Sequence, residues 1–497
     1  MGRVRAILAI VLTSLCAAPG ISGAAQVKVM TWNIADTVSE TSWNSSNAQK
    51  LGRVANFYQP DVLALNECAC GSTETARQKL TQSLTLWADA YLPDWPEKHV
   101  YVSALGDGYN RNAFVSRYPM YAFTEQALAP RGLVGAMIDL PGDIDVKVYT
   151  AHLKAFSDYN SAQQRQNGAN IYKNSVINWS YPIANAAIPY ILTGDWNEDE
   201  TNPQYPLSEW YHPITTVMES YVNEFNPDDG WGKHKTYSSG SPTRRFDYIL
   251  PSWHCRPDWT NSGLSWSRVI NTMVLYDHGQ LPAGLYRLDS QCSDHLCVIG
   301  TFDLLDGRIS SIRASADGEY VTGTTKYVTA SYSDHFYVQE PREPFAVRVN
   351  SAQGNPQVGY IVNFKGFYSS SPLEEDAVQL TGLRVLNTVQ GVVRPMGLRN
   401  RDINGESHAG VPVDGSAGPG NAGLLVKTWG RVVEPLAEGY FWLDDGSGYR
   451  VRVQSTKVVA LGDYVSAVGV VGYDAVDAAP RRLIKTRTEG DVQIYNP

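Results

Sequence analysis

A change of pattern near residue 305 is the feature that most constrains how this chain can fold. From Val27 to about Leu305, apolar segments of strand length alternate with segments of helical spacing, and beyond Leu305 the helical segments disappear. Alternating strands and helices are typical of an α/β domain, whereas short strands without helices are typical of all-β units. At 497 residues the chain is also too long for one compact domain. We therefore predict an α/β domain followed by small all-β domains.

The first part contains many strands, some in hairpins and some separated by helices, which favours an α/β sandwich. The expected strands are Val27–Trp32, Asp61–Leu65, Val100–Ala104, Asn112–Ser116, Ala136–Leu140, Val146–His152, Ile188–Thr193, Phe246–Leu250 and Leu296–Phe302. The expected helices are Gln49–Phe57, Glu74–Trp87 and Ser161–Asn178.

The second part contains a weak internal repeat. Residues 326–349 resemble residues 428–453, and a strand that begins with glycine follows each copy. Small repeated β units of this kind resemble OB-fold modules, which often bind oligonucleotides or sugars, and two β spacers without a ligand are an equal alternative. The predicted divisions are a catalytic α/β domain at 26–305, an OB-like domain at 306–408, a linker rich in Gly and Pro at 409–423, and an OB-like domain at 424–497.

The first 25 residues have the features of a secretory signal peptide. Arg3 and Arg5 precede an apolar run over residues 6–18, and small residues follow at 23–25. We predict that this segment is removed and that the product is secreted, into the extracellular space or a periplasm. A buried N-terminal helix is the alternative. No later run of about 20 apolar residues occurs, so the sequence predicts no transmembrane segment.

Five cysteines follow this segment, and an oxidising compartment favours disulfides between them. We predict a bond between Cys292 and Cys297 and a second bond between Cys255 and either Cys68 or Cys70, which leaves one thiol over. Zinc binding is the rival interpretation, but no Cys-x-x-Cys pair or His cluster supports it.

The charge of the chain limits how it can handle a phosphate. Lys and Arg number 41 against 50 Asp and Glu, which gives a net charge of −9. A protein that holds a polyanion by its overall charge is therefore excluded, and any phosphate needs a local positive device such as a metal ion.

Polar residues suited to metal-assisted chemistry stand where several apolar strands stop. Each one alone is more often a turn or cap residue. Stacked sheets would nevertheless bring such strand-end side chains together at one rim. In chain order they are Asn33, Glu67, His152, Asp195, Asn197, Asp247, Asp294 and His295.

The motifs around these residues are Thr-Trp-Asn, Leu-Asn-Glu, His-Leu-Lys, Gly-Asp-Trp-Asn, Phe-Asp-Tyr-Ile and Ser-Asp-His. In this order they resemble the endonuclease/exonuclease/phosphatase family, which includes deoxyribonuclease I, over about Val27 to Leu305. The resemblance implies a four-layer α/β sandwich, with two packed β-sheets flanked by helices, and metal-dependent hydrolysis of a phosphodiester. Trp196 and Asn66 replace residues that are commoner in the family, and neither change removes a functional group.

One set of these residues would bind the metal ion and activate the attacking water. Glu67 supplies a hard carboxylate for Mg²⁺, with Ca²⁺ or Mn²⁺ as alternatives, and the resemblance places Asn33 and Asp294 near the same metal. His295 suits the general base that takes a proton from water near pH 7. Asp247 would accept the other ring N–H of that histidine.

The remaining residues would bind the phosphate and assist the leaving group. Asp195 and Asn197 would orient the water and hold a phosphate oxygen, and His152, by similarity to deoxyribonuclease I, would assist the leaving group. Arg111 and Lys154 are further candidates for phosphate binding, and an ordinary surface role is equally open for both.

The substrate class stays open between three hypotheses. A secreted nuclease that cleaves DNA or RNA is favoured, with the OB-like modules guiding a strand. A sphingomyelinase-type phospholipase C is the alternative, although the sequence shows no apolar hairpin for entering lipid. A binding protein on an inactive scaffold is opposed by the intact acid, base and metal ligands. Tyr337, Tyr440, Phe441 and Trp442 are candidates for base stacking, and core positions are their more common outcome. No sequence feature indicates an oligomeric state.

Overall fold

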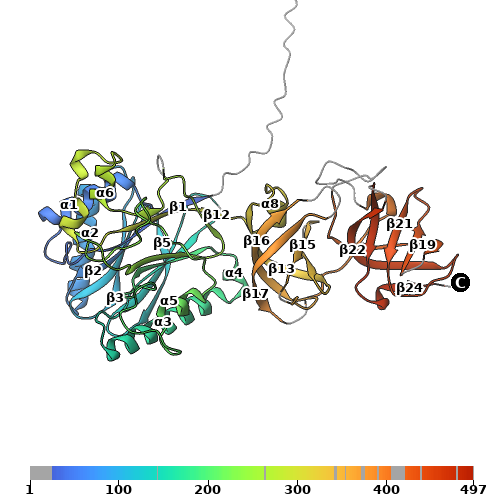
Figure 1. The fold of residues 1–497 in the computed structure, drawn as a ribbon, viewed down its shortest axis with the longest axis horizontal. Coiled ribbons are helices and arrows are strands. Elements are labelled where there is room, and N and C mark those ends of the chain that lie inside the picture. The colour runs from blue at the N-terminus through green and yellow to red at the C-terminus, as the bar shows by residue number, and fades with distance from the viewer. Residues whose placement is uncertain are drawn as a thin grey trace, which may run out of the picture.

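The molecule is a row of three β-containing parts (Figure 1). The computed structural model describes residues 25–495 except 143, 262–264, 341–343, 353, 371–374, 389–390, 404–419, 437–438 and 477–478. The predicted signal peptide, except its last residue, and most of the predicted linker lie outside the described residues.

One sheet of the first part has the order β10-β12-β1-β2-β4-β3, with β11 beside β12. These strands are β1 (Gln26–Asn33), β2 (Val62–Ala69), β3 (His99–Gly106), β4 (Asn110–Ser116), β10 (Cys255–Pro257), β11 (Arg268–Val269) and β12 (Val298–Leu304). Helices α1 (Ser46–Tyr58) and α2 (Glu74–Tyr91) cover one face, because their apolar sides share a core with the strands. Shorter helical elements nearby are α6 (Thr272–Asp277), η1 (Ala283–Leu285) and α7 (Leu288–Cys292).

The other sheet has the order β5-β6-β7-β8-β9. Its strands are β5 (Met120–Ala127), β6 (Gly132–Ile138), β7 (Val146–His152), β8 (Tyr190–Asp195) and β9 (Asp247–Pro251). Helices α3 (Tyr159–Ser180) and α5 (Pro213–Met218) cover its outer face, and α4 (Ile183–Ala186) follows α3. Apolar residues of both sheets form a third core between them. The four-layer α/β sandwich predicted from the resemblance is therefore confirmed.

The sequence did not reveal β5, and its burial pattern gives the reason. Most of its side chains are exposed or half-buried, so it lacks the apolar run that marks a strand inside a sheet. All of the strands and the three helices that the sequence predicts are present, with ends shifted by a few residues.

Two all-β units follow the sandwich. The first β unit (residues 320–387) is a closed barrel of order β13-β14-β15-β17-β16, preceded by α8 (Ile309–Arg313). Its strands are β13 (Tyr320–Ser331), β14 (His335–Gln339), β15 (Ala346–Asn350), β16 (Ile361–Ser369) and β17 (Ala377–Asn387).

The second β unit (residues 396–495) has the order β18-β19-β20-β21-β23-β22-β24, and β19 also pairs with β22. Its elements are β18 (Met396–Gly397), η2 (Asn400–Asp402), β19 (Leu425–Leu436), β20 (Tyr440–Asp444), β21 (Arg450–Gln454), β22 (Tyr464–Val476), β23 (Ala479–Lys485), η3 (Glu489–Asp491) and β24 (Val492–Ile494). The extra pairing closes β19-β20-β21-β23-β22 into the same order as the first barrel. The third and last strands of each ring run parallel in both units, which confirms the internal repeat. Their assignment to the OB fold stays a prediction.

The first β unit is fastened to one end of the sandwich. The Nζ of Lys365 donates to Asn223 Oδ1 at 2.8 Å, and the Arg384 guanidinium donates to Ser180 Oγ at 3.1 Å. Arg256 forms an ion pair with Glu319 at 2.7 Å. These contacts lie at the end where β8 begins and β9 ends, so the opposite end of the sandwich remains uncovered by the β units (Figure 1).

The disulfide predictions are wrong, because all five cysteines from Cys68 onward carry free, buried thiols. Cys68 and Cys70 belong to the core between a sheet and its helices, whereas Cys255 belongs to the core between the two sheets. The sheet itself therefore separates the proposed partners. Cys292 and Cys297 pack as small apolar side chains in the first of these cores, and burial raises the pKa of both thiols.

Among the described residues, no helix is both long enough and apolar enough to cross a membrane.

Candidate active site

Three polar residues form one row across the sheet that contains β7, β8 and β9. His152, the last residue of β7, pairs in register with Asp195, the last residue of β8. Asp195 pairs in turn with Asp247, the first residue of β9. All three side chains are about 1% exposed. The row forms because β9 runs antiparallel to β8, so that its first residue lies beside the last residue of its neighbour.

The glycine before Asp195 makes the close approach of β7 and β8 possible. Gly194 has a φ of +132°, and a Cβ at this position would lie 1.9 Å from the carbonyl oxygen of Ala151. Any other residue would clash with that strand or strain the backbone. The glycine of the Gly-Asp-Trp-Asn motif therefore holds the aspartate at its place in the row.

The other sheet contributes Asn33, Glu67 and the buried Asn66. A register shift on β2 between Leu65 and Cys68 marks a bulge, and Glu67 within it has a φ of +54°. Bulges re-aim side chains beside functional sites. Asn66, pointing inward, joins the two sheets: it donates to Thr150 Oγ1 at 3.2 Å and accepts the backbone N–H of Asp195 at 3.0 Å.

His295 lies between two carboxylates. Its Nδ1 is 2.7 Å from Asp247 Oδ2, and its Nε2 is 3.7 Å from Asp195 Oδ2. Burial alone lowers the pKa of His295, but the charges of Asp247 and Asp195 outweigh it and raise the pKa to about 10. Because Asp247 occupies Nδ1, the nitrogen that faces the rest of the site is Nε2.

His152 also lies near carboxylates, with its Nε2 3.4 Å from Asp195 Oδ2 and 3.6 Å from Glu67 Oε1, but it faces donors as well. Its Nε2 is 2.9 Å from a guanidinium nitrogen of Arg131 and 3.0 Å from the amide nitrogen of Asn197. Both neighbours are donors, so this nitrogen accepts and the ring is neutral. Burial first, and then the charges of Arg131 and His295, hold the pKa of His152 well below its usual value. The two histidines thus favour different protonation states within one site.

The carboxylates of Glu67 and Asp195 are the best candidates for holding a metal ion. Ligand atoms of Glu67, His152 and Asp195 lie within 4.8 Å of one another, and a second group joins Asp195, Asp247 and His295. Burial raises the pKa of Glu67, and burial raises that of Asp195 to about 7 in spite of the nearby His295 charge. Hard oxygen ligands whose charges are poorly solvated fit a hard divalent cation such as Mg²⁺.

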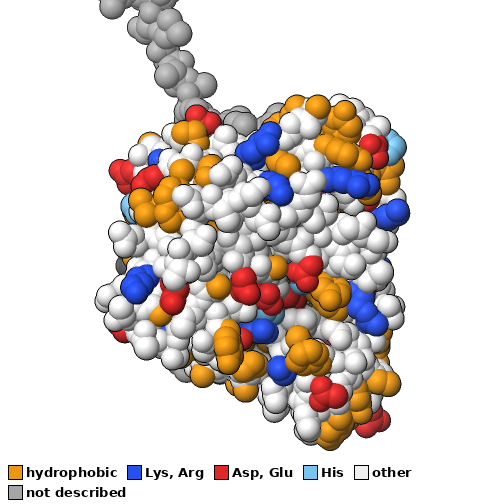
Figure 2. Space-filling model, turned by 90° about the vertical axis from the view of Figure 1, so that its left-hand side faces the viewer, with side chains coloured by type: hydrophobic (Ala, Val, Ile, Leu, Met, Phe, Trp, Pro, Cys, Tyr) orange, Lys and Arg blue, Asp and Glu red, His pale blue; other side chains and the backbone are white. Residues whose placement is uncertain are grey.

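The two other residues predicted near the metal are placed differently from each other. The Asn33 amide donates to Asp195 Oδ2 at 2.8 Å, so it orients one of the carboxylates. Asp294 is exposed on the turn before β12, and its charge contributes to the raised pKa of Glu67. Its carboxylate is outside both candidate ligand groups. On the end face of the sandwich, Figure 2 shows acidic side chains gathered near the middle with Lys and Arg around them.

Arg131 is a site residue that the sequence analysis missed. Its Nε is 2.9 Å from Asp107 Oδ2, and one of its terminal nitrogens contacts His152. It directly precedes β6, whose residue Leu133 pairs with Ala151, and this register brings Arg131 beside the end of β7. The strand expected from the sequence begins only at Ala136. Recognition of the full apolar run from Gly132 would have put Arg131 at the rim.

Arg111, predicted as a phosphate contact, has a different place. All of its N–H groups point to main-chain oxygens: Nε and one terminal nitrogen donate to Gly71 and Ser72, and the other terminal nitrogen donates to Ser103 and Ala104. A buried guanidinium that is fully engaged in this way is not available to a phosphate. The structure instead makes Arg111 a clamp between two loops.

Lys154 follows β7 instead of lying on it, and its Nζ sits 4.8 Å from the centre of the Phe156 ring. Its charge contributes to the lowered pKa of His152, so it is near the site. The carbonyls of Lys154 and Phe156 both accept hydrogen bonds from the buried Arg165, which fixes this loop. Its contact with phosphate stays a prediction.

A comparison with family models decides the family of this chain. The Endonuclease/Exonuclease/phosphatase family model matches residues 30–295, more than half of the sequence. The chain belongs to this family. Members of the family are hydrolases that act on phosphodiester bonds with a divalent metal, in agreement with the donor set described above. The comparison with curated protein sequences finds no match.

The solved structures that match this chain have low sequence identity to it. An endonuclease/exonuclease/phosphatase from Beutenbergia cavernae is 17% identical with a TM-score of 0.41, and the match covers 70% of this chain and 83% of that one. A humanized D. rerio TDP2 is 16% identical with a TM-score of 0.36, covering 56% and 98%. A Staphylococcus aureus beta toxin is 15% identical with a TM-score of 0.35, covering 55% and 99%.

Proposed function

We propose that this protein is a secreted, divalent-metal-dependent nuclease that hydrolyses DNA or RNA by attack of water on the phosphodiester. The observation that carries this proposal is the convergence of Glu67, Asp195, Asp247 and two histidines of opposite protonation preference at one end of the sandwich. Phosphodiester hydrolysis needs one group that accepts a proton and other groups that stabilise the growing negative charge.

His295 is the general base in this mechanism. Its Nε2 takes a proton from the attacking water, and the imidazolium that results is stabilised by Asp247 at 2.7 Å and by Asp195. Asp247 is itself held in place, because its backbone N–H donates to Thr236 Oγ1 at 3.1 Å. The base is therefore oriented before the substrate arrives.

Arg131 is the donor that faces a phosphate oxygen or the leaving oxygen, because its contacts with Asp107, His152 and the Leu153 carbonyl use only Nε and one terminal nitrogen. The Asn197 amide donates to His152 and to the Leu153 carbonyl, so it orients the ring. Both groups donate toward His152, whose neutral ring keeps them in place. The Asn197 backbone has a φ of +49° and its N–H donates to Asp195 Oδ1 at 2.8 Å, which sets the direction of its amide. His152 is thus placed to position these donors, and its predicted action on the leaving group remains to be tested.

Glu67 and Asp195 would hold the divalent cation, with the Asn33 amide orienting Asp195. When bound, the cation neutralises charge on the phosphate and acidifies water. Its positive charge would also oppose the protonation of the nearby His295 and so lower the pKa of that base.

The side chains around the site support nucleic acid as the substrate. Tyr109 and Phe156 are 81% and 66% exposed, and Phe156 lies beside the Lys154 ammonium. An exposed ring next to a cation suits stacking on a base beside a phosphate.

A substrate panel on purified protein tests the proposal. Plasmid DNA, single-stranded DNA, RNA, sphingomyelin and a phosphomonoester would each be incubated with Mg²⁺, with Ca²⁺ and with excess chelator, beside a Glu67→Gln control. We expect nucleic acid cleavage that requires the metal and is lost in the control. Cleavage of sphingomyelin with no cleavage of nucleic acid would establish the phospholipase alternative, and full activity in chelator would contradict the metal-dependent mechanism.

Secretion is tested separately. Expression of the full gene product should release protein that begins near Ala25 into the medium or periplasm, as measured by mass spectrometry of its N-terminus. A product that retains residues 1–25 inside the cell would contradict this part of the proposal.

A further inference from the structure

Three aromatic side chains of the second β unit stand in solvent on neighbouring strands. Trp429 on β19, Tyr464 on β22 and Tyr495 directly after β24 are 53%, 54% and 53% exposed. Large aromatic rings that are half exposed at adjacent positions leave apolar surface uncovered, which is typical of binding surfaces. The four aromatic residues considered from sequence do not form this set, since Tyr337 and Phe441 are buried in the cores.

The pairing of the strands places the rings on one face. Trp429 lies opposite Ser466 and Arg431 opposite Tyr464, and the backbone N–H of Tyr495 donates to the Tyr464 carbonyl at 2.7 Å. Trp429 and Tyr464 are thus diagonal neighbours, a separation of about 7–8 Å between backbones that large rings can span. We call Trp429, Tyr464 and Tyr495, together with the cations described next, the aromatic face.

Two cations flank the tryptophan on the same strand. Lys427 and Arg431 are two residues before and two residues after Trp429, so all three side chains point outward while Val426 and Val432 point into the core. Among the described residues of this unit, the ion pairs use other cations, such as Arg487, and neither Lys427 nor Arg431 is in one. Both charges are therefore available to an anionic ligand.

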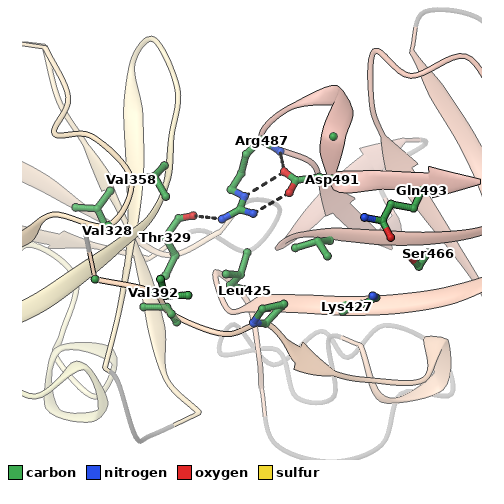
Figure 3. Close-up of a pocket in the computed structure, with 16 residues that line it drawn as sticks. Val328, Thr329, Val358, Val392, Leu425, Lys427, Ser466, Arg487, Asp491 and Gln493 are labelled. Atoms are coloured by element: carbon green, nitrogen blue, oxygen red, sulfur yellow. Dashed lines mark hydrogen bonds and ion pairs between the residues drawn. The ribbon is translucent and has the colours of Figure 1, made fainter. Parts of the chain in front are cut away.

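The aromatic face continues into a cavity between the two β units. This cavity has a volume of 410 Å³, and its lining includes Lys427, Ser466 and Gln493 from the same sheet face. Figure 3 shows Val328 and Thr329 of the first β unit on the opposite side, and Arg487 crossing between the units to the Thr329 carbonyl at 3.2 Å. Asp491 binds the same guanidinium at 2.7 Å, so Arg487 holds the wall of the cavity.

We propose that the aromatic face binds a single-stranded nucleic acid, with bases on Trp429 and Tyr464 and backbone phosphates beside Lys427 and Arg431. Proteins bind single strands without sequence preference by this combination of stacked rings and nearby cations. A neutral polysaccharide also stacks on aromatic rings, but it carries no anionic group that could pair with the two cations. The charges therefore favour the phosphate chain.

This site is separate from the candidate active site around His152, Asp195 and Asp247, which lies at the rim of the sandwich. The first β unit is fastened to the end of the sandwich opposite the rim, and the second β unit lies beyond it (Figure 1). A strand on the aromatic face is thus retained at a distance from the point of cleavage. The inference does not depend on the proposed catalytic function, because binding is measured without turnover.

Fluorescence anisotropy with a labelled 15-nucleotide oligo(dT) and full-length protein in chelator tests the inference. We expect Trp429→Ala to weaken binding by roughly 5- to 100-fold, the effect of losing one stacked base, and Trp429→Phe to restore much of it. Arg431→Ala should weaken binding less and should lower the slope of log affinity against log salt by about 0.7, the value for one phosphate contact on a single strand.

Trp442→Ala is the matched control, because this tryptophan is on the neighbouring strand β20 of the same unit and is half-buried. It should leave the affinity unchanged. If Trp442→Ala weakens binding and Trp429→Ala does not, the strand binds at β20 instead of at Trp429 and the inference is overturned. It is also overturned if the protein binds a soluble neutral glucan through Trp429 but no oligonucleotide.

The same variants separate this inference from the catalytic one. Oligonucleotide binding that depends on Trp429, in a protein that cleaves only lipid, would support the aromatic face and refute the nuclease. Nuclease activity together with oligonucleotide binding that ignores Trp429 and Arg431 would do the reverse.

Discussion

The rim of the sandwich and the aromatic face both collect side chains from neighbouring strands, but they do so in opposite ways. At the rim, charged groups such as Asp195 and Asp247 are about 1% exposed and are fixed by one another. On the aromatic face, Trp429 and Tyr464 are about half exposed. Buried charges control protonation and geometry, whereas exposed rings offer contact area. We therefore expect substitutions at the rim to change the rate of chemistry, and substitutions on the aromatic face to change affinity alone.

The largest effect on kcat is expected from the loss of a proposed metal ligand or of the proposed general base. Glu67→Gln and His295→Ala should each lower kcat by roughly two to four orders of magnitude, because they remove a metal ligand and the general base. Oligonucleotide binding in chelator should remain unchanged in both. A near-normal kcat in either variant would remove that residue from the mechanism, and lost binding would show that the two regions are not independent.

Asp247→Asn tests how the rim controls protonation. The Asp247 carboxylate raises the pKa of His295, so its neutralisation should lower that pKa. The base then stays unprotonated to lower pH, and the acid limb of the kcat/KM profile should shift to lower pH. The rate at the optimum should fall by roughly 10- to 1000-fold, because the imidazole loses its orienting partner. A profile that does not move, or moves to higher pH, would contradict the assignment of His295 as the base.

Substitutions of two arginines in the sandwich should have different effects, one on the catalytic rate and the other on the free energy of unfolding. Arg131→Ala should lower kcat/KM by roughly 10- to 100-fold with little change in thermal unfolding, since its guanidinium faces the reacting groups. Arg111→Ala should instead lower the free energy of unfolding by about 2 kcal/mol, because buried carbonyls lose their donors, while the folded fraction stays active. The reverse pattern would restore the original interpretation of Arg111 as a phosphate ligand.

The smallest effect is expected from the aromatic face on catalysis itself. Trp429→Ala should raise KM for long single-stranded DNA by roughly threefold to tenfold and leave kcat unchanged, because only retention of the polymer is lost. Cleavage of a small chromogenic phosphodiester should be unaffected. A fall in kcat on the small substrate would show that the second β unit acts on the rim.

Most of the candidate active site could be predicted, because its residues stand where apolar strands stop and belong to motifs that resemble a family. Glu67, His152, Asp195, Asp247 and His295 all lie in one site for this reason. The prediction of Arg111 failed because a charged residue in a strand can point to solvent or to buried carbonyls, and sequence alone does not distinguish these. Arg131 was missed because the start of its strand was placed too late.

The cysteine pairs failed for a related reason. Cys292 and Cys297 are close in sequence and belong to the same core, yet both thiols are free, so short spacing and a shared core do not by themselves bring two sulfurs into bonding geometry. The folded chain puts Cys68 and Cys255 on opposite sides of one sheet. A disulfide needs the two Cβ atoms within a few ångström, and only tertiary packing sets that distance.

The sequence by itself determined the α/β sandwich, the repeated β units and the identity of the acids and histidines at the strand ends, because periodicity and motif order are local properties of the chain. The tertiary structure alone decided the opposite pKa shifts of His152 and His295, the bulge that aims Glu67, and the position of Trp429 and Tyr464 on one face. These features depend on burial, on strand register and on which charges become neighbours, and each of these arises between segments that are far apart in the sequence.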